Sequence, residues 1–291
     1  MPIITEKINP ATVDIDLADG AEIARLINEE DKKVALAIEK IVPQIGLAIE
    51  EIAVRLQKGG RMAYFGSGTS GRIGILDASE MPPTFGVAPE LIRGYISGGE
   101  KAIRWAVENA EDNARLAEDD FADFNPQAND VIVAISASGN PQYTLRILEL
   151  ARKRNVLTIG VTSNPEAKFK PLADIFLCAE VGPEAISGSS RMKSGTAQKM
   201  ILNMLSTGVM IKMGKTYKNY MVDVQIHNQK LHERAVRYVC EISGASEKEA
   251  AKVLKIAGNV KVACVMIAKN CSAEEAHRIL AKNSGILRRV L

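Results

Sequence analysis

The chain has few of the residues that would link it to a metal, a disulfide framework or nucleic acid. Its 291 residues include only 4 cysteines. No two of these form a C-x-x-C pair, so the sequence predicts neither a disulfide framework nor a zinc site and favours a reducing compartment. Aromatic residues make up 4% and the formal net charge is +2. Neither base stacking nor a strong electrostatic field is available, and we expect no nucleic-acid or membrane partner.

Targeting and membrane signals are also missing from the sequence. The N-terminal MPIITEKINP has no basic stretch followed by an apolar run, which is the pattern of a secretory signal. No uninterrupted apolar segment approaches the ~20 residues that a membrane-spanning helix needs. We therefore expect a cytoplasmic protein.

Alternating strands and helices fill the centre of the chain. Two helical patterns, Lys101–Asp123 and Gln142–Arg154, lie between short apolar runs. These runs are Arg61–Phe65, Leu91–Ser97, Asp130–Ser136, Leu157–Ser163 and Asp174–Val181. Such alternation predicts an α/β fold of three layers, a parallel sheet covered on both faces. Ligands of such sheets bind beyond the carboxyl ends of the strands.

Helical segments flank this centre. Apolar residues at three- and four-residue steps predict a helix from Ala21 to Lys58, kinked or split at Pro43, that is either core packing or a dimer contact. Ser246-x-x-Glu249 and Ser272-x-x-Glu275 are capping boxes that predict short helices in a C-terminal bundle. The expected division is an N-terminal helical arm at 1–53, a sheet domain at 54–217 and a helical subdomain at 218–291.

Three expected strand ends open into loops of serine, threonine and glycine: GSGTSG at 66–71, SASGN at 136–140 and ISGSSRMKSGT at 186–196. Hydroxyl groups and the N–H groups of a helix N-terminus together make an anion site. One such loop is weak evidence, because serine and glycine are common in turns, but three in one sheet predict a phosphate site. The candidate binding residues are Ser67, Thr69, Ser70, Ser136, Ser138, Gly139, Asn140, Ser187, Ser189 and Ser190. Lys193 either neutralises part of the phosphate or is a solvated lysine on the helix that follows.

The first loop also matches the G-x-G-x-x-G pattern of dinucleotide-binding folds. That interpretation requires an acidic residue at the end of the second strand to bind the ribose. The second strand reads LIRGYISGG, and no acid follows before Glu100. A P-loop is excluded too, because the chain has no G-x-x-x-x-G-K-[ST]. The remaining interpretation is the monophosphate of a sugar.

Two glutamates are the candidates for acid–base chemistry. Glu80 precedes Pro82-Pro83, which predict a turn near the first loop. Glu111 falls on the next expected helix, among other acidic residues, and a solvated acidic face is its alternative. The sequence offers no metal cluster, no cysteine nucleophile and no serine–histidine pair, so carboxylates are the best candidates for proton transfer.

At nearly full length the sequence resembles the N-acetylmuramic acid 6-phosphate etherases, a family with a sugar isomerase (SIS) domain. The resemblance rests on TEKINPATVDID, INEEDKKV, GSGTSGRIGILDASEMPPTFG, ENAEDN, GPEAISGSSRMKSGTAQKMILNMLSTGVMIKMGK and NYMVDV. The DASE-x-PPTFG and SGSSR-x-KSGTAQK blocks are its specific parts. A departure is Asn140-Pro141, where the family more often has Arg-Thr, so the individual contacts of that loop do not carry over, whereas its phosphate role does.

The resemblance implies a lyase that converts N-acetylmuramic acid 6-phosphate to N-acetylglucosamine 6-phosphate and D-lactate, by elimination and then hydration. It implies Glu80 as the proton donor and Glu111 as its partner base, with no metal and no cofactor. It also implies a homodimer that shares its sites. The alternatives are a regulatory sugar-phosphate sensor, which needs the pocket but not the acids, and an aldose–ketose isomerase of sugar phosphates.

Overall fold

The computed structural model describes residues 4–226 and 229–291. The chain divides into two compact units: unit 1 comprises Met1–Ser79 and Glu90–Ser206, and unit 2 comprises Glu80–Pro89 and Thr207–Leu291. The predicted division has three parts and separates the arm from the sheet domain, whereas both belong to unit 1 here. That three-part division stays a prediction.

Unit 1 is built on a parallel sheet of five strands in the order β2-β1-β3-β4-β5. The strands are β1 (Met62–Gly66), β2 (Ile92–Ile96), β3 (Val131–Ile135), β4 (Leu157–Thr162) and β5 (Ile175–Cys178). All five predicted strands are confirmed, with bounds that shift by a few residues at most. β1, β3 and β4 are buried along their whole length, as expected when both faces are covered.

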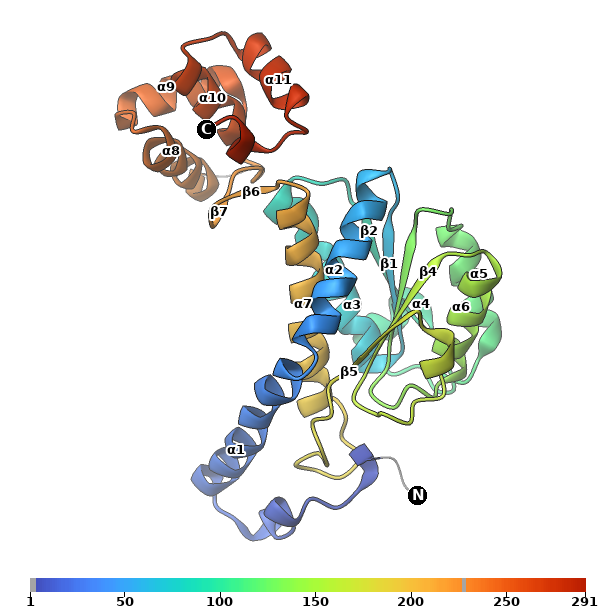
Figure 1. The fold of residues 1–291 in the computed structure, drawn as a ribbon. Coiled ribbons are helices and arrows are strands. Elements are labelled where there is room, and N and C mark those ends of the chain that lie inside the picture. Colours follow the sequence, from blue (N-terminus) through green and yellow to red (C-terminus); the bar gives the residue numbers. More distant parts are fainter. Residues whose placement is uncertain (1–3, 227–228) are drawn as a thin grey trace. The chain divides into compact units, whose positions relative to one another are not determined.

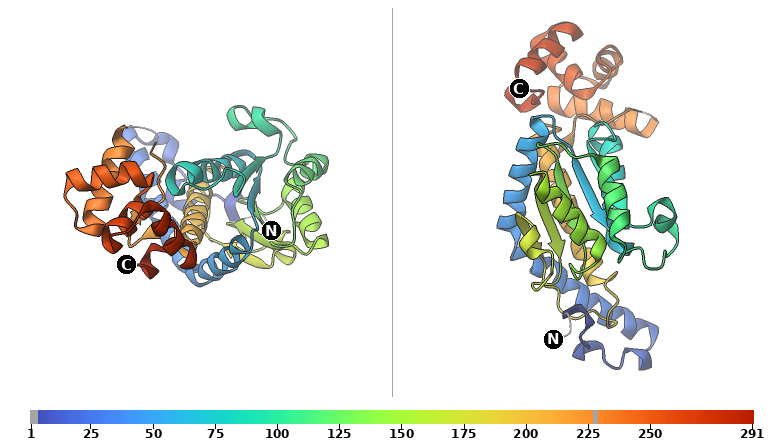
Figure 2. Two further views of the ribbon diagram at one scale, coloured as in Figure 1. Left: turned by 90° about the horizontal axis from the view of Figure 1, so that it is seen from above. Right: turned by 90° about the vertical axis from the view of Figure 1, so that its right-hand side faces the viewer.

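Helices cover both faces of this sheet (Figure 1; Figure 2). α5 (Ala114–Phe124) and α6 (Gln142–Lys153) lie on one face, and α2 (Val42–Gln57), α3 (Gly68–Phe85) and α7 (Lys193–Lys212) lie on the other. Side chains alternate along β1 accordingly. Phe65 packs in a cluster with Phe121 and Phe124 of α5, while the Tyr64 hydroxyl donates to Asp77 of α3 at 2.8 Å.

The N-terminal arm contains three short 3-10 helices, η1 (Ile4–Glu6), η2 (Pro10–Thr12) and η3 (Ile15–Leu17), then α1 (Gly20–Glu39). The Asp19 side chain caps α1 by accepting from the Glu22 N–H at 2.9 Å. The predicted long helix is split, because α1 ends at Glu39 and α2 begins at Val42 with Pro43 in its first turn. Proline is tolerated there, since the first N–H groups of a helix have no internal acceptor.

The single helix predicted over 101–123 is wrong. The chain forms α4 (Gly99–Arg104), leaves the helix, and resumes it as α5. Asn109 has a φ of 59°, which a right-handed helix cannot contain. The Asn113 side chain then starts α5 by accepting from the Arg115 N–H at 3.0 Å. Polar residues that cap and turn the backbone thus outweigh the helical pattern.

The turn predicted at Pro82-Pro83 is also wrong, because α3 continues through both prolines to Phe85. The fixed φ of proline fits a helix, and its usual cost is the lost N–H and the clash with the preceding turn. Here the prolines lie within the last turn, so no further helix depends on them. The Pro82 carbonyl still accepts from the Gly86 N–H at 2.9 Å.

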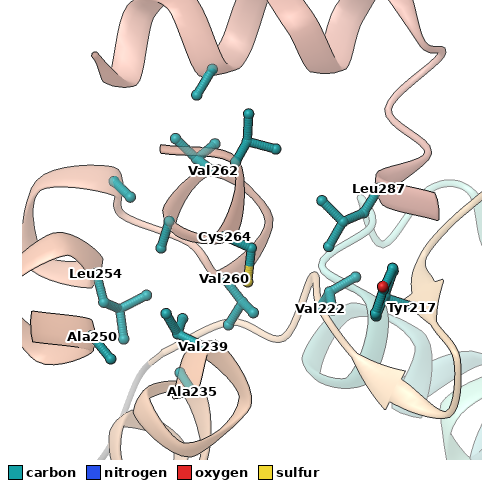
Figure 3. Packing of buried hydrophobic residues seen from close by; sticks show 14 of the residues in the cluster. Tyr217, Val222, Ala235, Val239, Ala250, Leu254, Val260, Val262, Cys264 and Leu287 are labelled. Carbon is teal, nitrogen blue, oxygen red and sulfur yellow. The ribbon is translucent and has the colours of Figure 1, made fainter. Parts of the chain in front are cut away.

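Unit 2 contains a hairpin that the sequence did not predict, β6 (Thr216–Tyr217) paired with β7 (Tyr220–Met221). Four helices follow: α8 (Gln229–Ser243), α9 (Glu247–Ala257), α10 (Val260–Lys269) and α11 (Ala273–Lys282), then η5 (Leu287–Arg289). Both predicted serine caps are confirmed, since Ser246 and Ser272 accept from the N–H of Glu249 and Glu275. Figure 3 shows the core of this unit, where Val239, Leu254 and Cys264 are buried together.

Within the described part of the chain, no helix has the length and apolar character needed to cross a bilayer.

Candidate active site

A cleft of ≈ 330 Å³ opens in unit 1 where β1 and β3 end. The strand order reverses between these two neighbours, because the chain leaves β1 toward β2 at one edge and leaves β3 toward β4 on the other side. In sheets of this order, ligands bind at that reversal. The cleft is lined by Thr5, Glu6, Ser67, Gly68, Thr69, Ser70, Glu111, Ser136, Ala137, Ser138, Pro141, Gly188 and Ser190. All three predicted loops therefore contribute to one cleft.

The first loop joins the end of β1 to the start of α3. A side chain at Gly71 would lie 2.6 Å from the Gly66 carbonyl oxygen, and one at Gly66 would lie 2.7 Å from the Gly71 nitrogen. The glycine pattern is thus needed for close packing of helix against strand. α3 begins at Gly68, a residue of the cleft lining, so the partial positive charge of its N-terminus lies at the cleft. Ser67 accepts a hydrogen bond from the Ser97 hydroxyl at 2.8 Å.

The second loop contributes two of its four predicted residues to the lining. Ser136 and Ser138 line the cleft, and the Ser136 hydroxyl also accepts from the Gly139 N–H at 3.0 Å. The Asn140 side chain accepts from the Lys168 N–H at 3.1 Å. Gly139 and Asn140 therefore shape the loop, while the two serines line the cleft.

The third loop contributes Ser190 and Gly188 to the lining. The Ser187 hydroxyl donates instead to the main-chain carbonyl of Glu6 at 3.0 Å. Ser189 is partly buried, and its N–H donates to the Ile186 carbonyl at 2.9 Å. Ser187 and Ser189 thus stay outside the lining, and their predicted contact with substrate stays a prediction that this geometry does not favour.

The N-terminus of α7 is occupied by a buried carboxylate. Glu184 accepts from the main-chain N–H of Lys193 at 2.9 Å, from that of Ser194 at 3.0 Å and from the Ser194 hydroxyl at 2.8 Å. Glu184 is fully buried. A carboxylate in this place takes up the helix N–H groups and repels a phosphate, so the third loop offers the cleft a side-chain hydroxyl rather than a helix N-terminus.

Lys193 is a buried residue of α7. Its side chain is 1% exposed, and its Nζ lies 2.5 Å from Glu30 Oε2, so the expectation of a solvated lysine is wrong. The predicted contact with phosphate stays a prediction that the pairing of this ammonium inside the protein does not favour. Lys33 pairs with the other oxygen of Glu30 at 2.5 Å. Burial raises the pKa of the Glu30 carboxyl, but hydrogen bonds from the two lysines outweigh it and the pKa lies below its ordinary value.

Of the two predicted catalytic glutamates, Glu111 lines the cleft. It also lines an adjoining pocket of ≈ 200 Å³ that shares Ser67 and Gly68. Glu111 lies in the turn before α5 rather than on a helix, with an exposed side chain. Its main-chain carbonyl accepts from the Tyr143 N–H at 3.0 Å, which ties this turn to α6. The turn is thus held by its backbone, and Glu111 is an exposed residue at the cleft.

Glu80 is an exposed residue of α3 and belongs to unit 2. Its role as proton donor stays a prediction.

Sequence reasoning from the loops missed Thr5 and Glu6, which line the same cleft. Their segment carried no chemical signal of its own and appeared only as part of the family resemblance. Within residues 4–226 and 229–291, no group of three or more His, Cys, Asp and Glu side chains is placed to hold a metal ion.

Comparisons with known proteins agree with this architecture. Residues 44–152 match the glucokinase regulatory protein N-terminal SIS domain, residues 114–208 match the SIS domain, and residues 218–261 match the C-terminal lid domain of glucokinase regulatory protein. Among solved structures, a candidate phosphosugar isomerase involved in capsule formation from Bacteroides fragilis is similar with a TM-score of 0.52 and 21% identity. The match covers 68% of this chain and 95% of that one, and it shows the fold.

Curated relatives are much closer in sequence. The N-acetylmuramic acid 6-phosphate etherase of Caldanaerobacter subterraneus is 49% identical over 98% of this chain and 94% of its own length. The etherase of Glaesserella parasuis is 47% identical over 99% of this chain and 95% of its own, and that of Escherichia coli K12 is 47% identical over 99% and 97%. With identity of this degree along almost the whole sequence, the chain belongs to the N-acetylmuramic acid 6-phosphate etherase family.

Proposed function

We propose that the protein cleaves the lactyl ether of N-acetylmuramic acid 6-phosphate and releases N-acetylglucosamine 6-phosphate and D-lactate. The observation that carries this proposal is the near full-length identity of 49% to an etherase, in a chain whose cleft contains Glu111 beside three hydroxyl-rich loops. The product pair is that of a carbon–oxygen lyase.

The phosphate binds among the first two loops in this proposal. Ser67, Thr69 and Ser70 offer hydroxyls at the start of α3, and Ser136 and Ser138 offer two more from the end of β3. A phosphate has several acceptor oxygens, and hydroxyls with helix N–H groups are suitable neutral donors. A site of this kind needs no lysine, consistent with the pairing of Lys193 to Glu30.

The chemistry then needs two proton transfers. In the open-chain sugar the C1 aldehyde acidifies the C2–H bond, and Glu111 takes this proton. The electron pair forms the C2–C3 double bond as the C3–O bond to lactate breaks. Glu80 is the proposed donor of the proton to the departing lactate oxygen. Water then adds its oxygen at C3 and a proton at C2, which gives the product sugar. General acids and bases of this type contribute about 10² to 10⁴ in rate.

We also propose that the protein is a cytoplasmic homodimer in which the second subunit helps complete each site. Support comes from exposed apolar side chains on the first two helices: Leu36 of α1 and Leu47 and Val54 of α2 are 61%, 53% and 44% exposed. Exposed apolar side chains of this size are candidates for burial in an interface. Solution scattering at assay concentration tests this, and a fully active monomer would contradict it.

The function itself is tested by incubating the purified protein with N-acetylmuramic acid 6-phosphate and measuring D-lactate with a stereospecific dehydrogenase. We expect equal molar amounts of D-lactate and N-acetylglucosamine 6-phosphate, and no turnover of the unphosphorylated sugar. Binding of the substrate without lactate release would favour a regulatory sensor instead. Conversion of aldose phosphates that lack the lactyl group would favour an isomerase.

A further inference from the structure

The N-terminal segment Thr5–Thr12 is fixed along the loop that precedes α7. The Thr12 hydroxyl donates to the Ala185 carbonyl at 2.7 Å, and the Asn9 side chain donates to the Pro183 carbonyl at 3.3 Å. Nearer the cleft, the Gly188 N–H donates to the Thr5 carbonyl at 3.1 Å. With the contact of the Ser187 hydroxyl on the Glu6 carbonyl, four hydrogen bonds hold this segment in place. Thr5, Asn9 and Thr12 are buried.

These contacts bring a second carboxylate into the cleft. Glu6 lines it together with Glu111, and the Glu6 side chain is exposed to solvent. Gly188 makes room for this carboxylate, because a Cβ at that position would lie 2.8 Å from Glu6 Oε2. Gly188 also has a φ of 74°, a conformation that favours glycine. The Glu6 carboxylate thus lies against the main chain at Gly188.

We propose that Glu6 contacts the substrate directly and accepts a hydrogen bond from a neutral donor on the sugar, a hydroxyl or the amide N–H. This inference rests on the proposed function and deepens it. A carboxylate repels the phosphate, so the hydroxyl-rich loops take the phosphate end and Glu6 faces the remainder of the molecule. A carboxylate is an acceptor only, and a sugar offers several donors. Glu6 therefore recognises the sugar, and the serine loops recognise the anion.

Two ligands separate these roles: N-acetylglucosamine 6-phosphate and inorganic phosphate, each measured by calorimetry. Glu6→Gln should weaken binding of the sugar phosphate about tenfold or more, the loss of one hydrogen bond to a charged group. The same change removes a negative charge, so binding of inorganic phosphate should be unchanged or tighter. Glu6→Asp keeps the charge with a shorter reach and should lie between wild type and Glu6→Gln.

The matched control is Asp14→Asn, the same chemical change on an exposed residue of the same arm whose side chain caps no helix. It should leave both affinities unchanged. An equal loss of affinity for both ligands in the Glu6→Gln variant would mean that the residue only holds the segment in place. This result would overturn the inference. So would sugar-phosphate binding equal to wild type. Failure of the proposed function is a separate result, because it is the absence of D-lactate release by the wild-type protein.

Discussion

The helices α3 and α7 both begin at loops of glycine, serine and threonine in unit 1, but their N-termini differ in what they bind. α3 begins at Gly68 inside the cleft lining. The first N–H groups of α7 are bound by the buried Glu184 carboxylate, and the first side chain of α7 is paired with Glu30. The N-terminus of α3 thus lies at the cleft, whereas that of α7 is satisfied by a carboxylate of the protein. Composition alone predicts an anion site at both, and at α7 the buried Glu184 carboxylate already occupies that place.

The largest expected effect comes from the cleft at α3. Glu111→Gln keeps the shape of the side chain but removes the proton acceptor, so lactate release should fall by about 10² to 10⁴. Binding of N-acetylglucosamine 6-phosphate should persist. The control is Asp112→Asn, an exposed neighbour that is not among the lining residues. Near-normal lactate release from Glu111→Gln would remove this residue from the mechanism.

Glu80→Gln tests the proposed partner of Glu111 in the same assay. We expect a loss of at least about 10² in lactate release. In deuterated solvent, recovered substrate that carries deuterium at C2 would show that proton abstraction survives while departure of lactate is blocked. Unchanged lactate release would exclude Glu80 as the donor.

The next effect is on stability and comes from α7. Lys193→Met leaves the Glu30 carboxylate buried with only Lys33 as its ionic partner, and loss of one partner of a buried pair costs about 3 to 5 kcal/mol. Urea denaturation should show this loss in the free energy of unfolding. Lys199→Met changes an exposed lysine of the same helix and should cost less than about 0.5 kcal/mol. Equal free energies of unfolding for the two variants would mean that the buried pair does not stabilise unit 1.

A smaller effect is expected on the KM, where two serines from similar loops should differ. Ser138 lines the cleft, whereas Ser189 lies outside its lining. Ser138→Ala should raise the KM roughly tenfold, the loss of one hydrogen bond of ~1.5 kcal/mol to a charged group. Ser189→Ala should leave the KM unchanged. A raised KM in Ser189→Ala with an unchanged KM in Ser138→Ala would place the phosphate at the third loop.

The smallest effect is a pH dependence at the Glu30 pair. Because the pKa of Glu30 is lowered in the folded protein, its contribution to stability is present above the unfolded pKa of about 4.3 and is lost as the pH falls through the folded value. The difference in unfolding free energy between wild type and Glu30→Gln should therefore be largest near neutral pH and shrink in acid. A difference that grows in acid would contradict the direction of this shift.

The sequence predicted the sheet well, because buried parallel strands such as Val131–Ile135 are short apolar runs with clear ends. It also predicted that Ser67, Ser136 and Ser190 belong to one site, since loops at the carboxyl ends of strands share one edge of the sheet. The sequence-based prediction failed where the environment of a side chain depends on partners that are distant in sequence. Glu30 and Lys193 are 163 residues apart, and no local pattern reveals such a pair.

Glu6 shows the same limit. Its place in the cleft depends on hydrogen bonds between the segment Thr5–Thr12 and residues around Gly188, more than 170 positions along the chain. The turn that presents Glu111 was hidden for a different reason. A helical pattern runs through it, and only the conformation of Asn109 shows that the helix is broken there.

The most direct test of the proposed site is a crystal structure of the protein with N-acetylglucosamine 6-phosphate. We expect the phosphate within hydrogen-bond distance of hydroxyls or N–H groups of Ser67–Ser70 and of Ser136 and Ser138, with the sugar toward Glu6 and Glu111. We also expect Glu184 still to bind the N–H groups of Lys193 and Ser194. A phosphate bound at the N-terminus of α7, with Glu184 displaced, would contradict the proposed site.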